Sequence, residues 1–130
     1  MTVLETSFVI DILQNVPAAL KLLDKLQGTE SAIYVTSPTV MELWEGALRS
    51  KLSDKEKERV DGLLASVAVL HFDVRAAKRA AELRFELSQK GTPVELRDVM
   101  IASVTLVNGE MIVTSDSDYA RIPGLKVLKY

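Results

Sequence analysis

The chain has 130 residues, 48% of them hydrophobic and 26% charged, a mixture typical of one globular domain, here covering residues 1–130. Its formal net charge of −2 excludes a strong overall attraction to nucleic acid, although a local basic patch would still bind it. The absence of cysteine excludes disulfides and thiolate metal sites. The start MTVLETSFVID lacks the pattern of a signal peptide, and the apolar runs are shorter than the roughly 20 residues of a membrane span. We therefore expect a cytoplasmic protein.

Short β-type segments alternate with longer helical segments along the whole chain. Strands are predicted at residues 2–5, 32–36, 67–72, 111–114 and 125–128. Helices are predicted over residues 7–14, 17–28 and 38–50, from about 53, over 73–90, and from about 93 to 108. One helical turn is expected between the last two strands. This alternation predicts an α/β fold.

Capping residues mark the expected helix starts. Ser7 is the candidate N-cap of the first helix, and Ser37 followed by Pro38 is the candidate start of the third. Residues 53–56 (SDKE) and 92–95 (TPVE) match the capping-box pattern, in which the first and fourth side chains satisfy free backbone N–H groups. These four positions are therefore predicted to begin helices.

The predicted strands carry continuous apolar runs rather than strict alternation. Such runs are typical of parallel sheets covered by helices on both faces. We therefore expect a three-layer α/β fold with a central five-stranded parallel sheet. In such sheets ligands bind at the carboxyl ends of the strands.

Four acids lie at or near this predicted edge. Glu5 ends the first strand, and Asp116 lies two residues beyond the fourth. Glu42 falls in the first turns of the helix after the second strand, and Asp98 falls early in the helix that begins near Thr92. Separate segments thus bring four carboxylates toward one edge, which points to a functional site.

Each acid also has an ordinary structural explanation. Glu5 suits a strand end facing water, and Glu42 suits a solvated helix face. Asp116 suits an N-cap, and Asp118 suits the start of a helical turn. Asp98 is harder to explain in this way, because its helical neighbours belong to the apolar run VMIASVTLV, where an unpaired carboxylate is costly.

Carboxylates that converge repel one another unless a cation neutralises them. Oxygen ligands without histidine or cysteine suit Mg²⁺ or Mn²⁺, which activate water and stabilise the leaving oxygen in phosphoryl chemistry. His71 is the only histidine, so a Ser-His-Asp or Cys-His triad is not supported, and no GxxxxGK[ST] phosphate loop is present. The residues therefore favour a metal-assisted reaction on phosphate esters.

Four segments resemble the motifs of PIN-domain ribonucleases, in the order and spacing of that family. They are VLETSFVID, TSPTVMELWEGA, GTPVELRDVMIASVTLVNG and IVTSDSDYARIPGLKV, and together they span nearly the whole chain. The small size and the YARIPGLKV ending are most similar to the toxin subunits of VapBC-type toxin–antitoxin pairs.

The resemblance implies an endoribonuclease that requires Mg²⁺ or Mn²⁺, forms a homodimer or higher homo-oligomer, and is silenced by an antitoxin protein. It implies the catalytic acids Glu5, Glu42, Asp98 and Asp116, and the metal ligands Glu5, Asp98, Asp116 and Asp118. Thr6, Ser7 and Thr114 would orient ligands or water, and Arg49 and Lys51 are the candidate contacts to RNA.

One departure leaves an alternative open. The first acid of the family is normally aspartate, whereas this chain has Glu5, whose extra methylene shifts the carboxylate. A catalytically weak PIN-like binding or scaffold module is therefore the second hypothesis. The third is a Mg²⁺-binding phosphoacceptor signalling domain, which would need a phosphorylatable aspartate at the end of the third strand. Asp73 lies there but suits the N-cap of the next helix.

The helix predicted over residues 73–90 contains an alanine-rich stretch with Ala76, Ala77, Ala80 and Ala81. Small side chains let backbones approach closely. This stretch therefore predicts either a self-association surface or a tight contact within the chain.

Overall fold

A computed structural model of the chain describes residues 2–29 and 32–130. Its strands are β1 (Thr2–Leu4), β2 (Ile33–Thr36), β3 (Ala68–Leu70), β4 (Met111–Thr114) and β5 (Lys126–Lys129). Its helices are α1 (Thr6–Leu13), α2 (Pro17–Gln27), α3 (Ser37–Arg49), α4 (Ser53–Leu64), α5 (Val74–Gln89) and α6 (Leu96–Val107), with the 3₁₀ helix η1 (Ser117–Arg121) before β5. Among these described residues, no helix is both long enough and apolar enough to cross a membrane.

The five strands form one parallel sheet in the order β3-β2-β1-β4-β5, so the predicted α/β fold is confirmed. β1 is central, with Val3 opposite Tyr34 of β2 and Ile112 of β4. The chain builds outward from β1 through β2 to β3, and then crosses to the other side of β1 for β4 and β5. Strand order therefore reverses between β1 and β4, and this is where open α/β sheets hold their ligands.

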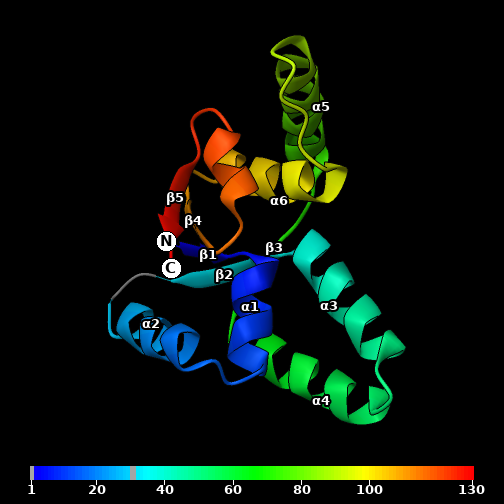
Figure 1. The fold of residues 1–130 in the computed structure, drawn as a ribbon, viewed down its shortest axis with the longest axis vertical. Coiled ribbons are helices and arrows are strands. Elements are labelled where there is room, and N and C mark those ends of the chain that lie inside the picture. Colours follow the sequence, from blue (N-terminus) through cyan, green and yellow to red (C-terminus); the bar gives the residue numbers. More distant parts are fainter. Residues whose placement is uncertain (1, 30–31) are drawn as a thin grey trace.

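Helices cover both faces of the sheet, as expected for buried parallel strands (Figure 1). Successive strand residues point to opposite faces, so Val3 and Ile112 join one core while Leu4 and Val113 join the other. The first core contains side chains of α5, α6 and η1. The second contains side chains of α1, α2, α3 and α4.

Several predicted helix starts are wrong by a few residues. Glu5, not Ser7, is the N-cap of α1, because the Glu5 side chain accepts a hydrogen bond from the Ser7 N–H. Thr36, not Ser37, caps α3 by accepting from the Thr39 N–H, while the Ser37 hydroxyl accepts from Phe72 N–H instead. Thr36 is the last residue of β2, and Glu5 is the first residue after β1, so each helix is capped where its strand ends.

Neither predicted capping box forms. The N-cap of α4 is Leu52, which makes no side-chain capping bond, and Ser53 is the first helical residue. α6 begins only at Leu96, and Glu95 is extended and makes no capping bond. Thr92 precedes Pro93, and a residue before proline is disfavoured in the helical conformation. Val94 packs against the core. Residues 92–95 are therefore not helical, and the helix begins after them.

The alanine-rich face of α5 makes a contact within the chain. Ala76, Ala80, Leu83 and Leu87 are buried, and all but Ala76 belong to the same core cluster as Val99 of α6. The other two alanines, at 77 and 81, are exposed. Figure 1 shows α5 extending beyond the sheet while α6 lies across it. Of the two alternatives predicted for this alanine-rich stretch, a tight contact within the chain therefore describes the buried face of α5.

Candidate active site

The predicted acids gather at the carboxyl end of the sheet, where the strand order reverses. Glu5 directly follows β1, and Asp116 lies two residues after β4, the strand paired with β1. Glu42 comes from α3 and Asp98 from the first turn of α6. Interactions with Asp116, Glu5 and Glu42 all raise the pKa of Asp98, so the four carboxyl groups share one electrostatic environment.

Glu5 is nearly buried, with 4% of its surface exposed. Its carboxylate accepts hydrogen bonds from the Ser7 N–H at 3.1 Å, from the Ser7 hydroxyl at 2.5 Å, and from the Thr114 hydroxyl. The Ser7 hydroxyl oxygen also accepts from the Ser115 N–H at 3.2 Å. This network joins the end of β1, the start of α1 and the end of β4. Ser7 and Thr114 therefore hold the Glu5 carboxylate from two different segments.

Burial is the main influence on the pKa of Glu5, and it raises that pKa above the ordinary value. The hydrogen bonds from Ser7 and Thr114 act in the opposite direction because they favour the ionised carboxylate, while the Asp116 charge adds to the rise. The protein thus keeps a carboxyl group in a buried position, where ionisation of that group is energetically unfavourable. A nearby cation would offset that cost.

A chain of hydroxyl groups positions Glu42. The Thr6 hydroxyl donates to Glu42 Oε1 at 2.8 Å and lies 3.0 Å from the Thr39 hydroxyl. The Thr36 hydroxyl lies 3.2 Å from the same Thr39 oxygen. Thr6, Thr36 and Thr39 are buried. The ends of β1 and β2 therefore fix the direction of one Glu42 oxygen.

Asp98 has a buried partner in Tyr119. The Tyr119 hydroxyl donates to Asp98 Oδ1 at 3.0 Å, and Tyr119 is completely buried. Burial raises the pKa of Asp98 from 3.8 to about 6, the Tyr119 hydrogen bond opposes this rise, and the neighbouring acids Asp116, Glu5 and Glu42 add to it. The adjacent Arg97 pairs with α3 instead of with Asp98.

Asp116 and Asp118 complete the acidic group. Asp116 is the N-cap of η1, because its side chain accepts from the Asp118 N–H at 2.9 Å, as the N-cap interpretation of the sequence predicted. The Asp116 N–H donates to the Thr114 hydroxyl at 3.0 Å, which links Asp116 to the Glu5 network. Asp118 forms an ion pair with Arg121 at 2.9 Å.

Three of these carboxylates are close enough to share one cation. Asp98, Asp116 and Asp118 each offer an oxygen within 4.8 Å of the other two, and all three side chains are partly exposed. The set contains only hard oxygen donors, which suit Mg²⁺ or Mn²⁺ and do not suit softer ions that need nitrogen or sulfur. The raised pKa of Asp98 also fits a cation that would favour its ionised form.

Arg97 lies nearer to the acids than Arg49 and Lys51, the basic residues predicted to contact RNA. Arg49 lies at the C-terminal end of α3, pairs with Glu45 at 3.8 Å, and has 81% of its side chain exposed. Lys51 is exposed beyond the end of that helix. Arg97 instead contacts Glu42 at 3.8 Å and Glu45 at 3.3 Å. Its reach toward α3 depends on how α3 and α6 pack, so the sequence pattern gave no signal for it.

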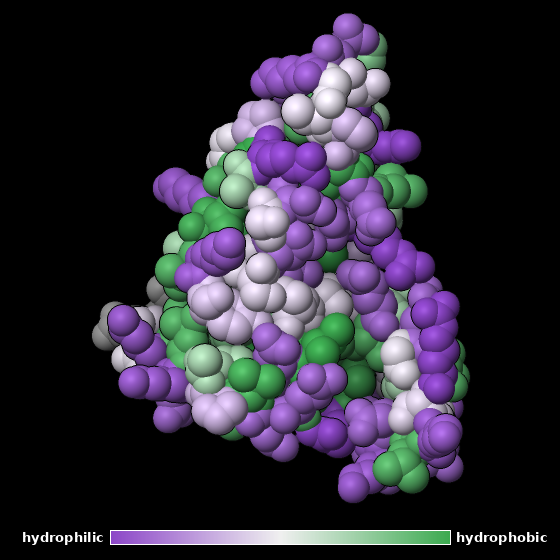
Figure 2. Space-filling model, viewed as in Figure 1, coloured by the Kyte–Doolittle hydropathy of each residue, from purple (hydrophilic) through white to green (hydrophobic). Residues whose placement is uncertain are grey.

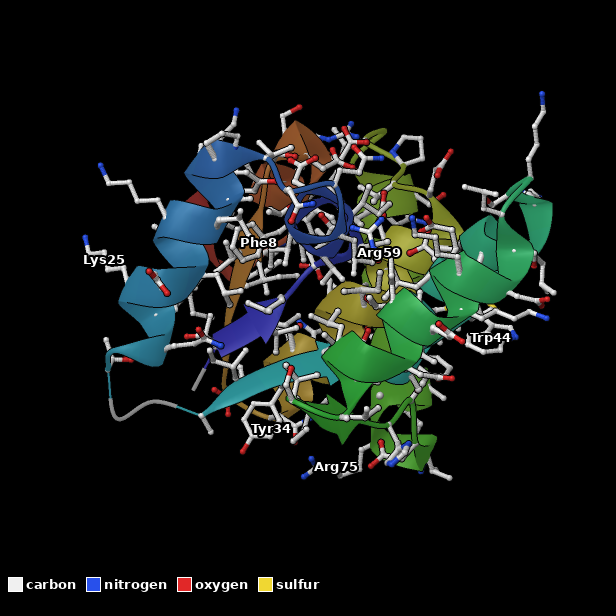
Figure 3. The ribbon with its side chains drawn as sticks, turned by 90° about the horizontal axis from the view of Figure 1, so that it is seen from below. Phe8, Lys25, Tyr34, Trp44, Arg59 and Arg75 are labelled. Atoms are coloured by element: carbon white, nitrogen blue, oxygen red, sulfur yellow. The ribbon has the colours of Figure 1, made fainter. Side chains whose placement is uncertain are left out.

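A cavity of about 380 Å³ adjoins Glu42 on the side away from α6. It lies among α1, α3 and α4, and its lining is mainly apolar, with Ile10, Leu13 and Val60 among the contributors. Figure 2 shows hydrophobic side chains inside a hollow of this surface. In Figure 3 the labelled Arg59 extends from α4 toward α1, and this arginine lines the cavity and pairs with Glu56 at 3.4 Å.

The PIN domain family matches residues 2–125, which include every acid of the site. The chain belongs to the PIN domain family. It is 32% identical to the tRNA(fMet)-specific endonuclease VapC of Salmonella typhimurium, over 95% of this chain and 93% of that protein. A homologue of the same name from Shigella flexneri is 30% identical over 95% of this chain and 92% of that protein. The chain is thus a VapC-type PIN protein.

Solved structures agree with this assignment. DNA-bound VapBC from Salmonella typhimurium contains a chain that superposes with a TM-score of 0.90 at 32% identity, covering 98% of this chain and 96% of that one. VapBC2 from Rickettsia felis, bound to a promoter DNA fragment, superposes with a TM-score of 0.92 at 24% identity, covering 99% and 98%, and so supports the fold. The matches favour a ribonuclease over the scaffold and signalling alternatives. Asp73 is indeed the N-cap of α5, accepting from the Ala76 N–H at 2.9 Å.

Proposed function

We propose that this protein is the toxin of a toxin–antitoxin pair and cleaves RNA phosphodiester bonds with the help of Mg²⁺ or Mn²⁺. The observation that carries the proposal is the meeting of Glu5, Glu42, Asp98, Asp116 and Asp118 at the point where strand order reverses. Its second support is the similarity to VapC endonucleases over most of the chain. We further propose that residues 1–130 act as one PIN unit in the cytoplasm.

Asp98, Asp116 and Asp118 would hold the ion, with Glu5 contributing directly or through water. When bound, the ion would lower the pKa of a water and stabilise the charge on the leaving oxygen. The role of the chain is to hold the acids in place before the substrate arrives. Ser7 and Thr114 do this for Glu5, and Tyr119 does it for Asp98.

Glu42 is placed to position the attacking water. One of its oxygens is occupied by the Thr6 hydroxyl at 2.8 Å, and the other faces Arg97 at 3.8 Å. With its direction fixed by the buried threonines, Glu42 can accept a proton from water at a defined place. In this proposal Asp98, Asp116 and Asp118 bind the cation, and Glu42 orients the water.

Initiator tRNA is the first substrate to test, because the relatives at 32% and 30% identity are named tRNA(fMet)-specific endonucleases. An antitoxin is the expected protein partner, because the structural matches include VapBC assemblies and a chain from a toxin–antitoxin complex of Klebsiella pneumoniae. Homodimerisation also belongs to the proposal. The mainly apolar cavity beside Glu42 offers an antitoxin a surface directly next to the site.

The test is cleavage of initiator tRNA, and of a mixed RNA pool, by the purified protein with Mg²⁺, Mn²⁺ or EDTA. We expect discrete products with either ion and none with EDTA, and no products from an Asp98→Asn protein with any ion. Cleavage that persists in EDTA would contradict the metal requirement. An intact RNA pool with both ions, using protein shown to be free of antitoxin and folded, would contradict the ribonuclease assignment.

A further inference from the structure

Two arginines flank the acidic group from different elements. Arg97, on α6, lies 3.8 Å from Glu42 and 3.3 Å from Glu45. Arg121, at the end of η1, lies 2.9 Å from Asp118. Their side chains are 46% and 44% exposed, so each keeps part of its guanidinium open to solvent. The acidic group is therefore bordered by one cation on the Glu42 side and one on the Asp118 side.

The place of Arg97 in its helix is unfavourable by itself. It is the second residue of α6, where the positive end of the helix dipole disfavours a cation. Glu42 and Glu45 offset that cost from α3, through contacts that involve two of the guanidinium nitrogens. A guanidinium has five N–H donors in a planar fork, so donors remain free for a phosphate while the carboxylate contacts persist.

Substrate binding creates a need for these cations. RNA brings negative phosphates to a surface where five carboxylates converge, on a chain with a formal net charge of −2. A divalent ion neutralises only part of this charge at the reacting phosphate. Neighbouring phosphates still need positive partners, and the planar guanidinium matches phosphate oxygens in a bidentate arrangement.

We propose that Arg97 and Arg121 hold the RNA backbone on either side of the acidic group, and that the exposed pair Arg49 and Lys51 does not. This inference rests on the proposed ribonuclease function and names the contacts that the substrate makes at that site. Arg49 lies seven positions after Glu42, about 10 Å along a helix, whereas Arg97 contacts Glu42 itself.

Arg49 also supplies a matched control. Its guanidinium pairs with the same Glu45 oxygen as Arg97, at 3.8 Å rather than 3.3 Å, but among the described residues it pairs with no acid of the site. Arg49→Gln and Arg97→Gln therefore remove the same charge and a contact with the same Glu45, and Arg97→Gln also removes the contact with Glu42. They differ in whether the lost cation borders the acidic group.

The experiment measures binding of fluorescent initiator tRNA, in EDTA so that the RNA stays intact, at several KCl concentrations. Each lost phosphate contact should lower the slope of log affinity against log salt by about 0.7 to 0.9, the range from single-stranded to duplex nucleic acid. Arg97→Gln and Arg121→Gln should each show this change and bind about tenfold more weakly in low salt. Arg97→Lys should keep the slope, because the charge remains. Arg49→Gln should match the parent in both measurements.

Thermal unfolding of each variant separates RNA binding from a purely structural role. If Arg97→Gln melts at a lower temperature but keeps the parent's salt slope, Arg97 only ties α6 to α3 and the proposal is overturned. It is also overturned if Arg49→Gln changes the slope and the other two variants do not. A parent protein that binds this tRNA and cleaves it with Mg²⁺ or Mn²⁺ keeps the proposed function intact in both cases. A parent that neither binds nor cleaves any RNA overturns both.

Discussion

The hydroxyl of Tyr119 donates a hydrogen bond to Asp98 Oδ1 across 3.0 Å, although the two residues come from different elements. Asp98 lies in the first turn of α6, and Tyr119 lies in η1 with no exposed surface. The bond stabilises the ionised carboxylate, whereas burial and the neighbouring acids favour the protonated form. Tyr119 therefore favours the ionised form of Asp98, which is the form that binds a cation.

Tyr119→Phe should raise the pKa of Asp98 above its present value of about 6, because it removes the one interaction that opposes the rise. Protons would then compete better with the ion. We expect the affinity for Mn²⁺ to fall several-fold at pH 6 and less at pH 8, measured by calorimetric titration. An equal loss at both pH values would show that the hydroxyl acts by placing the carboxylate and leaves its protonation unchanged.

Asp98→Asn should abolish ion-dependent cleavage and stabilise the ion-free protein. A carboxyl with a raised pKa binds its proton more tightly in the folded chain than in the unfolded chain. Its contribution to stability is therefore greatest below pH 3.8 and declines as the pH rises to about 6. At pH 7 the variant should be more stable by about 1 kcal/mol, a value reduced from the full shift because the side chain is only partly buried.

Urea unfolding in EDTA at pH 4 and pH 7 measures this difference. The gain should be present at pH 7 and much smaller at pH 4, where the parent carboxyl is mostly protonated in the folded state. A variant that is less stable than the parent at both pH values would identify Asp98 as a structural partner. The charge of Asp98 would then be needed for folding, and its place among the ion ligands would be lost.

The buried face of α5 gives a prediction about stability. Ala80 is 5% exposed in the core cluster shared with α6, whereas Ala81 is exposed. Ala80→Glu should lower the free energy of unfolding by several kcal/mol, because it forces a charge into a packed interface. Ala81→Glu should change it by less than about 0.5 kcal/mol. If sedimentation shows that Ala81→Glu, while folded, breaks a dimer of the parent, the exposed alanines form the self-association surface.

The sequence predicted the layers and the acids better than the contacts between elements. Apolar runs locate strands because burial of both sheet faces leaves a local pattern, and such runs are followed by Glu5 directly and by Asp116 two residues later. The pairing of β1 with β4, which brings these two acids together, depends on packing across the whole chain. Capping failed as a guide at Ser7 because the helix is capped two residues earlier, where the Glu5 carboxylate accepts from the Ser7 N–H.

Arg97 illustrates the same limit. Consecutive helix residues face different ways, so Arg97 and Asp98, although neighbours in sequence, point in different directions. Periodicity alone does not say what the face with Arg97 meets. The contacts with Glu42 and Glu45 exist only because α6 packs beside α3. A single sequence therefore does not predict the partners of side chains, such as Arg97, that bridge two helices.

Glu5→Gln should destabilise the ion-free protein, opposite to Asp98→Asn. Glu5 accepts from the Ser7 N–H, the Ser7 hydroxyl and the Thr114 hydroxyl, whereas glutamine has no charge and offers one oxygen and two donors. One donor of the network would face another donor in a buried place. We expect a loss of about 1–3 kcal/mol in urea unfolding in EDTA. A stabilised Glu5→Gln protein would mean that the cost of burying the charge, with the repulsion from Asp116, outweighs this network.

Glu5→Asp tests how the ion tolerates the longer side chain. The parent carboxylate reaches one methylene further than aspartate and is held by hydrogen bonds from Ser7 and Thr114. Mg²⁺ requires a nearly ideal octahedron at short distances, so a displaced ligand penalises it more than it penalises the larger Mn²⁺. The parent should therefore cleave RNA faster with Mn²⁺ than with Mg²⁺. In Glu5→Asp the Mg²⁺-dependent rate should rise and the ratio of the two rates should fall. An unchanged ratio would show that the ion does not sense the Glu5 carboxylate, which would leave Glu5 to act only on the positions of Thr114 and Asp116.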